Sequence, residues 1–211
     1  MIFDCDGTLV DSEPISNRIL SQSLNELGVK FTEERCTKEF LGLNWSDTIA
    51  RIELLTRKPL PTGFQDNVTA RRLTALKGSV KEMPGAGEAV QRILVSGYKV
   101  CVASSSEMPR IKINLEETGL SKYFGSNVFS ATQVANGKPN PDLFLFSAER
   151  MGIPPGECAV VEDNMNGFNA GLAAGMPVFA YMPNNALPPM IDRVTTFNAF
   201  NDLPDLISKF A

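Results

Sequence analysis

The most regular feature of the chain, after residue 81, is the alternation of short apolar runs with segments of helical periodicity. The nearly unbroken apolar run 98–103 is typical of a strand buried in a parallel sheet. Further strands are predicted over 1–5, 127–131, 158–162 and 177–181, and helices over 86–96, 108–118, 141–151, 165–174 and 203–210. Strands and helices that alternate through short connections predict βαβ units, in which helices cover both faces of a parallel sheet.

Between residues 14 and 80 the pattern is helical and poor in strands. Apolar side chains such as Leu20, Leu24 and Leu27 recur at helical spacing, and Gly28 follows as a stop signal. Further helices are predicted over 32–40, 46–56 and 64–77. We therefore expect an α/β protein with a doubly wound, Rossmann-like parallel-sheet core. Residues 1–13 and 81–211 would form this core, and residues 14–80 an inserted α-helical cap domain.

Composition places the chain among globular proteins and excludes several function classes. Of its 211 residues, 43% are apolar and 21% are charged, which are ordinary proportions. A net charge of −4 and a pI near 5.0 argue against a nucleic-acid surface. No apolar run reaches the length of about 18 residues that a membrane helix needs. The absence of histidine excludes Ser-His and Cys-His nucleophiles and a histidine-ligated zinc site.

The cysteines indicate a compartment. Cys5, Cys36, Cys101 and Cys158 show no CxxC spacing, and three of them lie in apolar runs. We expect buried free thiols in a reducing cytoplasm. Only three residues precede Asp4, which is short for a central strand, so we leave open whether the native chain continues before Met1.

Two acidic residues follow the first predicted strand. Asp4 and Asp6 are two positions apart, so their carboxylates point to the same side if the strand extends that far. They repel each other unless a cation or a raised pKa compensates. Gly7 and Thr8 then end the strand and leave backbone N–H groups that suit a phosphate.

Polar and charged residues also follow the later predicted strands. Ser104 begins a run of three serines after one strand, Lys138 lies in a Gly/Pro-rich loop after another, and Glu162 and Asp163 end a further one. Each has a structural explanation, namely a turn, a solvated lysine or a helix cap. Ligands of parallel sheets bind at the carboxyl ends of the strands, however, so their recurrence there predicts one shared site.

In order and spacing, these residues resemble the four motifs of the haloacid dehalogenase superfamily. The matching positions are Asp4-x-Asp6-Gly7-Thr8, Ser104, Lys138 and Glu162-Asp163. The resemblance covers essentially the whole chain, and the pattern is most similar to phosphatases and mutases related to β-phosphoglucomutase. The helical segment after the first motif resembles the helical cap of that family.

The resemblance implies phosphoryl transfer through a covalent intermediate. Asp4 would be the nucleophile and form an aspartyl-phosphate, which needs no histidine because a carboxylate is already ionised at pH 7. Asp6 would protonate the leaving oxygen and then accept a proton from the attacking water. Ser104 and the backbone N–H of Ser105 would bind the phosphoryl oxygens, and Lys138 would bridge the nucleophile and the phosphoryl group.

The resemblance also implies a magnesium site. Asp4, the backbone carbonyl of Asp6, and Asp163 supported by Glu162 would hold Mg²⁺, which prefers hard oxygen ligands. With Asp6 protonated, the other three carboxylates carry three negative charges, and Lys138 with Mg²⁺ carries three positive ones. A phosphate dianion would then enter a site close to neutrality.

A monoester phosphatase is the reaction that the residues favour. A dehalogenase needs no second acid, because halide leaves without a proton, so Asp6 argues for phosphoryl transfer. The alternative is a sugar-phosphate mutase of the β-phosphoglucomutase type, which uses a cap histidine and a cap arginine. The aligned positions here are Ser16 and Trp45, and neither can do the same work. A phosphate sensor without catalysis is a third hypothesis, but it would need neither Asp4 nor Asp6.

The resemblance places substrate specificity in the cap. Gly42 would let the backbone approach the substrate, Asn44 would bind hydroxyls, and Trp45 would pack on a sugar face or inside the cap core. Of Arg71 and Arg72 on the last cap helix, one would bind a distal phosphate or carboxylate, and a solvated helix face is the alternative.

We expect a small phosphate ester, either a sugar phosphate or a sugar-acid phosphate, as the molecular partner, and no nucleic acid or membrane. The chain would act as a monomer or weak dimer. The cap would open and close about connections near residues 12–14 and 80–84.

Overall fold

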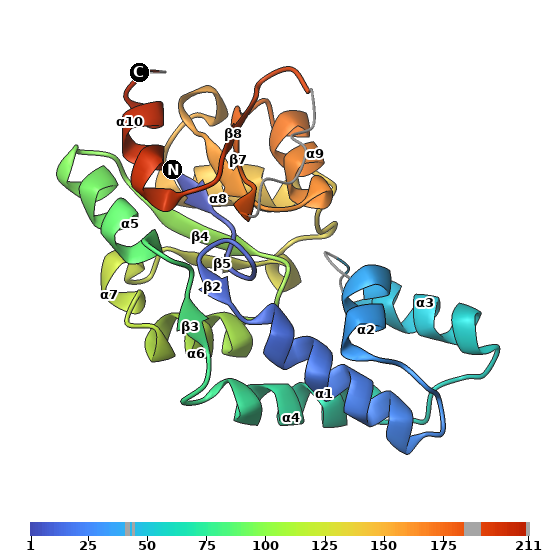
Figure 1. Ribbon diagram of the computed structural model, residues 1–211. Helices are drawn as coiled ribbons and strands as arrows, with labels where there is room; N and C mark the ends of the chain where they lie inside the picture. The colour runs from blue at the N-terminus through green and yellow to red at the C-terminus, as the bar shows by residue number, and fades with distance from the viewer. Residues whose placement is uncertain (41–42, 44, 184–190, 210–211) are drawn as a thin grey trace.

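A six-stranded sheet lies at the centre of the computed structural model, which describes residues 1–40, 43, 45–183 and 191–209 (Figure 1). The strands are β1 (Ile2–Phe3), β4 (Cys101–Ser104), β5 (Val128–Ser130), β6 (Val160–Glu162), β7 (Val178–Tyr181) and β8 (Val194–Phe197). Their order is β5-β4-β1-β6-β7-β8, and every pairing in this sheet is parallel. The first strand of the chain is therefore central, with β4 on one side and β6 on the other.

Helices cover both faces of the sheet. One face packs against α5 (Ala86–Val95), α6 (Met108–Glu117), α7 (Ser121–Phe124) and α10 (Leu203–Ile207), and the other against α8 (Asp142–Met151) and α9 (Met165–Ala173). Strand residues alternate between the two apolar layers, with Phe3 in the first and Ile2 in the second. The doubly wound α/β architecture is thereby confirmed.

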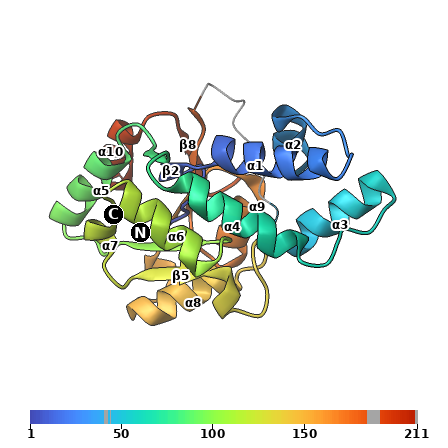
Figure 2. The ribbon, with the colours of Figure 1, turned by 90° about the horizontal axis from the view of Figure 1, so that it is seen from below.

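Four further helices lie together at one side of the sheet (Figures 1 and 2). They are α1 (Glu13–Glu26), α2 (Glu33–Phe40), α3 (Trp45–Thr56) and α4 (Phe64–Leu76). They share an apolar cluster of their own, which includes Leu24, Ile52 and Val68. The connections that lead into and out of this helical layer pair with each other as an antiparallel ribbon of β2 (Val10–Asp11) and β3 (Lys81–Glu82).

The strands β2, β3 and β8 and the short helix α7 were not predicted from the sequence. The ribbon strands contain two residues each and are mostly charged, so they lack the apolar alternation that marks a strand. All four cysteines are free and buried. Among the described residues, no helix combines the length and the apolar character needed to cross a membrane.

Candidate active site

The carboxyl ends of the three central strands meet at one edge of the sheet. Asp4 follows β1, Ser104 ends β4 and Glu162 ends β6. Ile2 is in register with Cys101 on one neighbouring strand and with Val160 on the other. The fold therefore brings together acidic and hydroxyl side chains that are far apart in the sequence.

A buried lysine joins two of the carboxylates. The Nζ atom of Lys138 donates to Asp4 Oδ1 at 2.5 Å and to Glu162 Oε1 at 2.8 Å. The three residues are only 6%, 5% and 0% exposed, respectively. Burial alone would lower the pKa of Lys138, but the two carboxylates raise it above its usual value, so the ammonium remains charged. Burial raises the pKa of Asp4 well above its usual range, and the charge of Lys138 acts in the opposite direction.

A cation would fit beside this pair. Asp4, Glu162 and Asp163 each place one carboxylate oxygen within 4.8 Å of the others. Burial, and then repulsion by Glu162, raises the pKa of Asp163 to about 8. Thr8 Oγ1 donates to Asp163 Oδ1 at 3.0 Å and fixes its orientation. This set of hard oxygen atoms suits Mg²⁺.

Glu162 is held too firmly to be a flexible ligand. Besides Lys138 at Oε1, its Oε2 accepts hydrogen bonds from the backbone N–H groups of Asp163 at 2.8 Å and Asn164 at 3.0 Å. The side-chain amide of Asn164 donates to the same oxygen at 3.0 Å. Glu162 therefore orients Lys138 and the loop after β6, while Asp4 and Asp163 remain the carboxylates best placed to contact a cation.

Asp6 has a different environment. Its carboxylate accepts hydrogen bonds from hydroxyl, guanidinium and amide groups, which are those of Ser12, Ser104, Ser106, Arg110 and Asn114. Burial alone would raise the pKa of Asp6. The Arg110 guanidinium and the hydrogen bonds from Ser106 and Ser12 outweigh that effect and lower the pKa.

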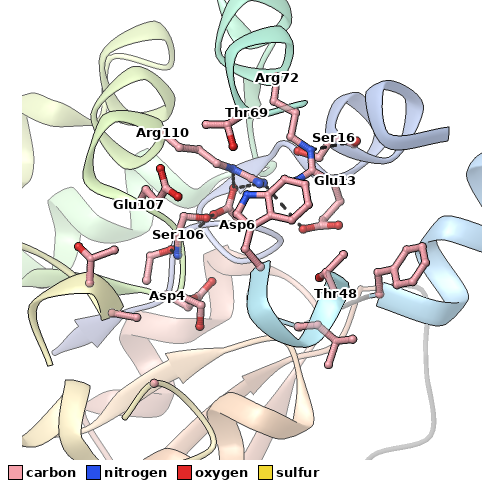
Figure 3. A pocket seen from close by; sticks show the side chains of 18 of the residues that line it. Asp4, Asp6, Glu13, Ser16, Thr48, Thr69, Arg72, Ser106, Glu107 and Arg110 are labelled. Atoms are coloured by element: carbon pink, nitrogen blue, oxygen red, sulfur yellow. Dashed lines mark hydrogen bonds and ion pairs between the residues drawn. The ribbon is translucent and has the colours of Figure 1, made fainter. Parts of the chain in front are cut away.

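A cavity of about 370 Å³ opens between the carboxylates and the helical layer. Its core side is lined by Asp4, Asp6, Ser104, Ser105 and Asp163, and its helical side by residues of α1, α3 and α4. Figure 3 shows Arg72, Arg110 and Asp4 among the residues around this space. The cavity can hold a small polar molecule with one end against Asp4.

The two arginines of α4 lie in different places. Arg71 forms an ion pair with Glu26 at 2.8 Å and is not among the cavity-lining residues. Arg72 lines the cavity, donates through Nε to the Ser16 carbonyl at 3.3 Å, and lies over the Trp45 ring at 4.6 Å. Adjacent residues of a helix point about 100° apart, so only one of the two can face the cavity.

Trp45 and Ser16 both line the cavity, whereas Gly42 and Asn44 lie outside the described residues.

Sequence reasoning missed the partners of Asp6 on α6, which are Arg110 and Asn114. One signal for them was present. A helix that starts just after a strand end places its first turns at the same edge of the sheet, and α6 starts four residues after β4.

Comparisons with known proteins give the family. Residues 1–175 match the model of the haloacid dehalogenase-like hydrolases. The chain is 29% identical over 208 residues to 6-phosphogluconate phosphatase of Escherichia coli (strain K12), covering 98% of this chain and 93% of that protein. It is 31% identical over 176 residues to fructose-1-phosphate phosphatase of the same organism, covering 83% and 92%.

A solved structure agrees with these sequence matches. The crystal structure of a conserved haloacid dehalogenase-like protein from Agrobacterium tumefaciens matches with a TM-score of 0.80 at 31% identity, covering 99% of this chain and 97% of that one. The resemblance drawn from the four motifs is confirmed. The chain belongs to the haloacid dehalogenase-like hydrolases.

Proposed function

We propose that this protein is a Mg²⁺-dependent phosphatase that hydrolyses a sugar phosphate or sugar-acid phosphate through an aspartyl-phosphate on Asp4. The protein is a phosphoric monoester hydrolase, and its relatives include phosphatases named for 6-phosphogluconate and fructose 1-phosphate. The observation that carries the proposal is the buried Lys138, which contacts Asp4 and Glu162 beside Asp163 under a cavity of substrate size.

In the first step Asp4 attacks phosphorus in line with the leaving oxygen. Lys138 holds Asp4 Oδ1, which fixes the carboxylate in one orientation and offsets its charge. Ser104 and Ser105 line the cavity beside it and would bind phosphoryl oxygens. Asp4, Asp163 and the backbone carbonyl of Asp6 would hold Mg²⁺, which supplies the positive charge that lets a phosphate dianion approach these carboxylates.

Asp6 moves the protons. It lines the same cavity as Asp4 and would give a proton to the leaving oxygen, then take one from the water that hydrolyses the aspartyl-phosphate. A dehalogenase would not need this residue. Because Ser16 and Trp45 occupy the places where the mutase has a histidine and an arginine, and the chain has no histidine, hydrolysis is favoured over mutase chemistry.

The helical side of the cavity would select the substrate. Arg72 lines the cavity, contacts the Trp45 ring and donates through Nε to the Ser16 carbonyl. A guanidinium in this position suits a carboxylate or phosphate at the far end of a sugar.

We place the reaction in the cytoplasm, as expected for a protein with four free buried thiols.

The test is phosphate release from 6-phosphogluconate, fructose 1-phosphate, glucose 6-phosphate and phosphoglycolate, with and without Mg²⁺. Asp4→Asn preserves the shape of the side chain but removes the nucleophile. Release that needs Mg²⁺ and disappears in Asp4→Asn, while the circular dichroism spectrum is unchanged, would support the proposal. Absence of release from every substrate in the presence of Mg²⁺ would refute it.

A further inference from the structure

The two oxygens of Asp6 have chemically different partners. Oδ1 accepts from Arg110 Nε at 3.1 Å, from Arg110 Nη2 at 2.7 Å and from Asn114 Nδ2 at 2.9 Å, and also from the Ser12 hydroxyl. Oδ2 accepts from the hydroxyls of Ser106 at 2.6 Å and Ser104 at 3.4 Å. The carboxylate is thus anchored through one oxygen by nitrogen donors and contacted through the other by hydroxyls.

This difference decides which oxygen can carry a proton. Guanidinium and amide N–H groups can only donate hydrogen bonds, so a proton on Oδ1 would face three N–H groups directly. A serine hydroxyl can rotate and accept instead. A proton on Oδ2 would therefore keep every contact of Asp6 satisfied, whereas a proton on Oδ1 would not.

The anchor is buried and belongs to the core. The side chains of Arg110 and Asp6 are 16% and 10% exposed, and Asn114 is fully buried. Arg110 and Asn114 are four residues apart on α6, so they lie on one face of the helix and reach the same oxygen. Figure 3 shows the Arg110 side chain running from this helix to the carboxylate.

We propose that Arg110 and Asn114 are positioning residues that anchor Oδ1 of Asp6 and reserve Oδ2 for proton exchange with the leaving oxygen and the attacking water. Neither residue needs to contact the substrate for this role. The inference rests on the proposed function, because it assumes that Asp6 is the acid and base of the phosphatase reaction. It adds the orientation of that group, which none of the four motifs specifies.

The experiment compares two leaving groups. An alkoxide that leaves a sugar phosphate needs a proton from Asp6, whereas p-nitrophenolate leaves p-nitrophenyl phosphate as a stable anion. The quantity to compare is kcat/KM, because it covers only the steps up to leaving-group release and is insensitive to the later water step. We expect Arg110→Gln to lower kcat/KM by about 100-fold for the best sugar phosphate, which is the size of a general-acid contribution, and by less than about 10-fold for p-nitrophenyl phosphate.

Two further variants keep the test informative. Arg110→Lys retains the charge but loses the forked donor, so it should show the same selectivity with a smaller loss. Asn114→Ala should also be selective, because it removes one donor to Oδ1. Arg92→Gln is the matched control, since Arg92 forms an exposed ion pair with Asp205 and is not among the cavity-lining residues, so both values should be unchanged.

The outcomes separate the inference from the proposed function. If the wild-type protein hydrolyses both substrates and Arg110→Gln lowers both kcat/KM values equally, or lowers neither, the positioning role is wrong while the phosphatase stands. If Arg110→Gln does not fold, Arg110→Lys and Asn114→Ala decide by the same criterion. If the wild-type protein with Mg²⁺ hydrolyses neither substrate, the proposed function fails, and this inference fails with it.

Discussion

Glu162 packs against the backbone of Gly167 in the first turn of α9, closer than any other residue type would allow. A Cβ atom on Gly167 would lie 1.9 Å from Cδ of Glu162. The contact lets the carboxylate turn back onto the loop after β6, where it accepts hydrogen bonds from the backbone and from Lys138. A small residue outside the four motifs thus sets the position of the buried acid.

Gly167→Ala should therefore displace Glu162 and, through it, Lys138. We expect a loss of about 1–3 kcal/mol in the free energy of unfolding, as is usual for overpacking, together with reduced phosphatase activity. Urea denaturation and phosphate release would measure the two effects. Gly156→Ala is the control, because a Cβ there meets nothing within 4 Å, and its stability should change by less than about 0.5 kcal/mol. Equal effects of the two substitutions would contradict the prediction.

Lys138 is the second residue whose substitution should lower both the stability of the fold and the phosphatase activity. Lys138→Met would leave Asp4 and Glu162 buried beside each other with no cation. Breaking such a buried pair by removing one partner costs about 3–5 kcal/mol, so the urea midpoint should fall strongly. Lys112→Met, at an exposed position of α6, should leave the midpoint nearly unchanged. A Lys138→Met protein as stable as wild type would show that the carboxylates need no compensation.

The sequence was enough to predict the site residues at the strand ends, but not the residues that contact them from other elements. Asp4, Ser104 and Glu162 could be grouped because parallel strands end at one edge of a sheet. The anchor of Asp6 could not, since Arg110 lies 104 positions away and nothing in the sequence says where its side chain points. The same limit applies to Arg71 and Arg72, whose directions depend on how α4 is rotated against the core.

At the scale of elements, the ribbon of β2 and β3 governs how the helical layer is joined to the core. Asp11 and Lys81 face each other in the ribbon, and both are exposed. If the helical layer opens to admit substrate and closes to exclude water, the movement must pass through these paired connections.

A disulfide across the ribbon would test this idea. In Asp11→Cys/Lys81→Cys, oxidation should lower kcat several-fold without lowering the melting temperature, and a reductant should restore kcat. The oxidised and reduced forms of one variant are each other's control, and the four native cysteines are buried and so are protected from the reagent. Unchanged turnover in the oxidised form would mean that the ribbon is not a hinge.

The long helices could be predicted because they bury one face in regular periods. The spacing predicted 46–56 and 64–77, and the structure has α3 at Trp45–Thr56 and α4 at Phe64–Leu76. The ribbon strands were missed because pairing between two charged dipeptides depends on where the helices carry the chain. β8 was missed although its β-branched residues suit a strand, because its partner β7 determines its place at the sheet edge.

For the whole molecule, the raised pKa values in the acidic cluster link stability to pH. The pKa of Asp163 is about 8 in the folded protein, against about 4 in an unfolded chain. Between these values the folded protein holds a proton that the unfolded chain has released, so this group's contribution to stability falls as the pH rises toward about 8. Asp4, whose pKa is also raised, contributes in the same direction.

If Mg²⁺ binds as proposed, it competes with that proton, because it would bind the ionised carboxylates and only in the folded state. The rise in melting temperature produced by a fixed Mg²⁺ concentration should therefore be larger near pH 8 than near pH 6. Differential scanning fluorimetry would measure it, with Asp163→Asn expected to lose most of the rise at both pH values. A rise of the same size at both pH values in the wild-type protein would exclude this linkage.

The central place of β1 has a consequence for biosynthesis. This strand leaves the ribosome before most of the chain, yet both of its neighbours, β4 and β6, are translated much later. Helices α1 to α4 can pack on one another soon after they emerge, because their cluster needs no later residue. Asp4, the proposed nucleophile, cannot pair with Lys138 until that later part of the chain has been made, and Glu162 follows later still. In a nascent chain the helical layer can therefore form before the proposed active site assembles.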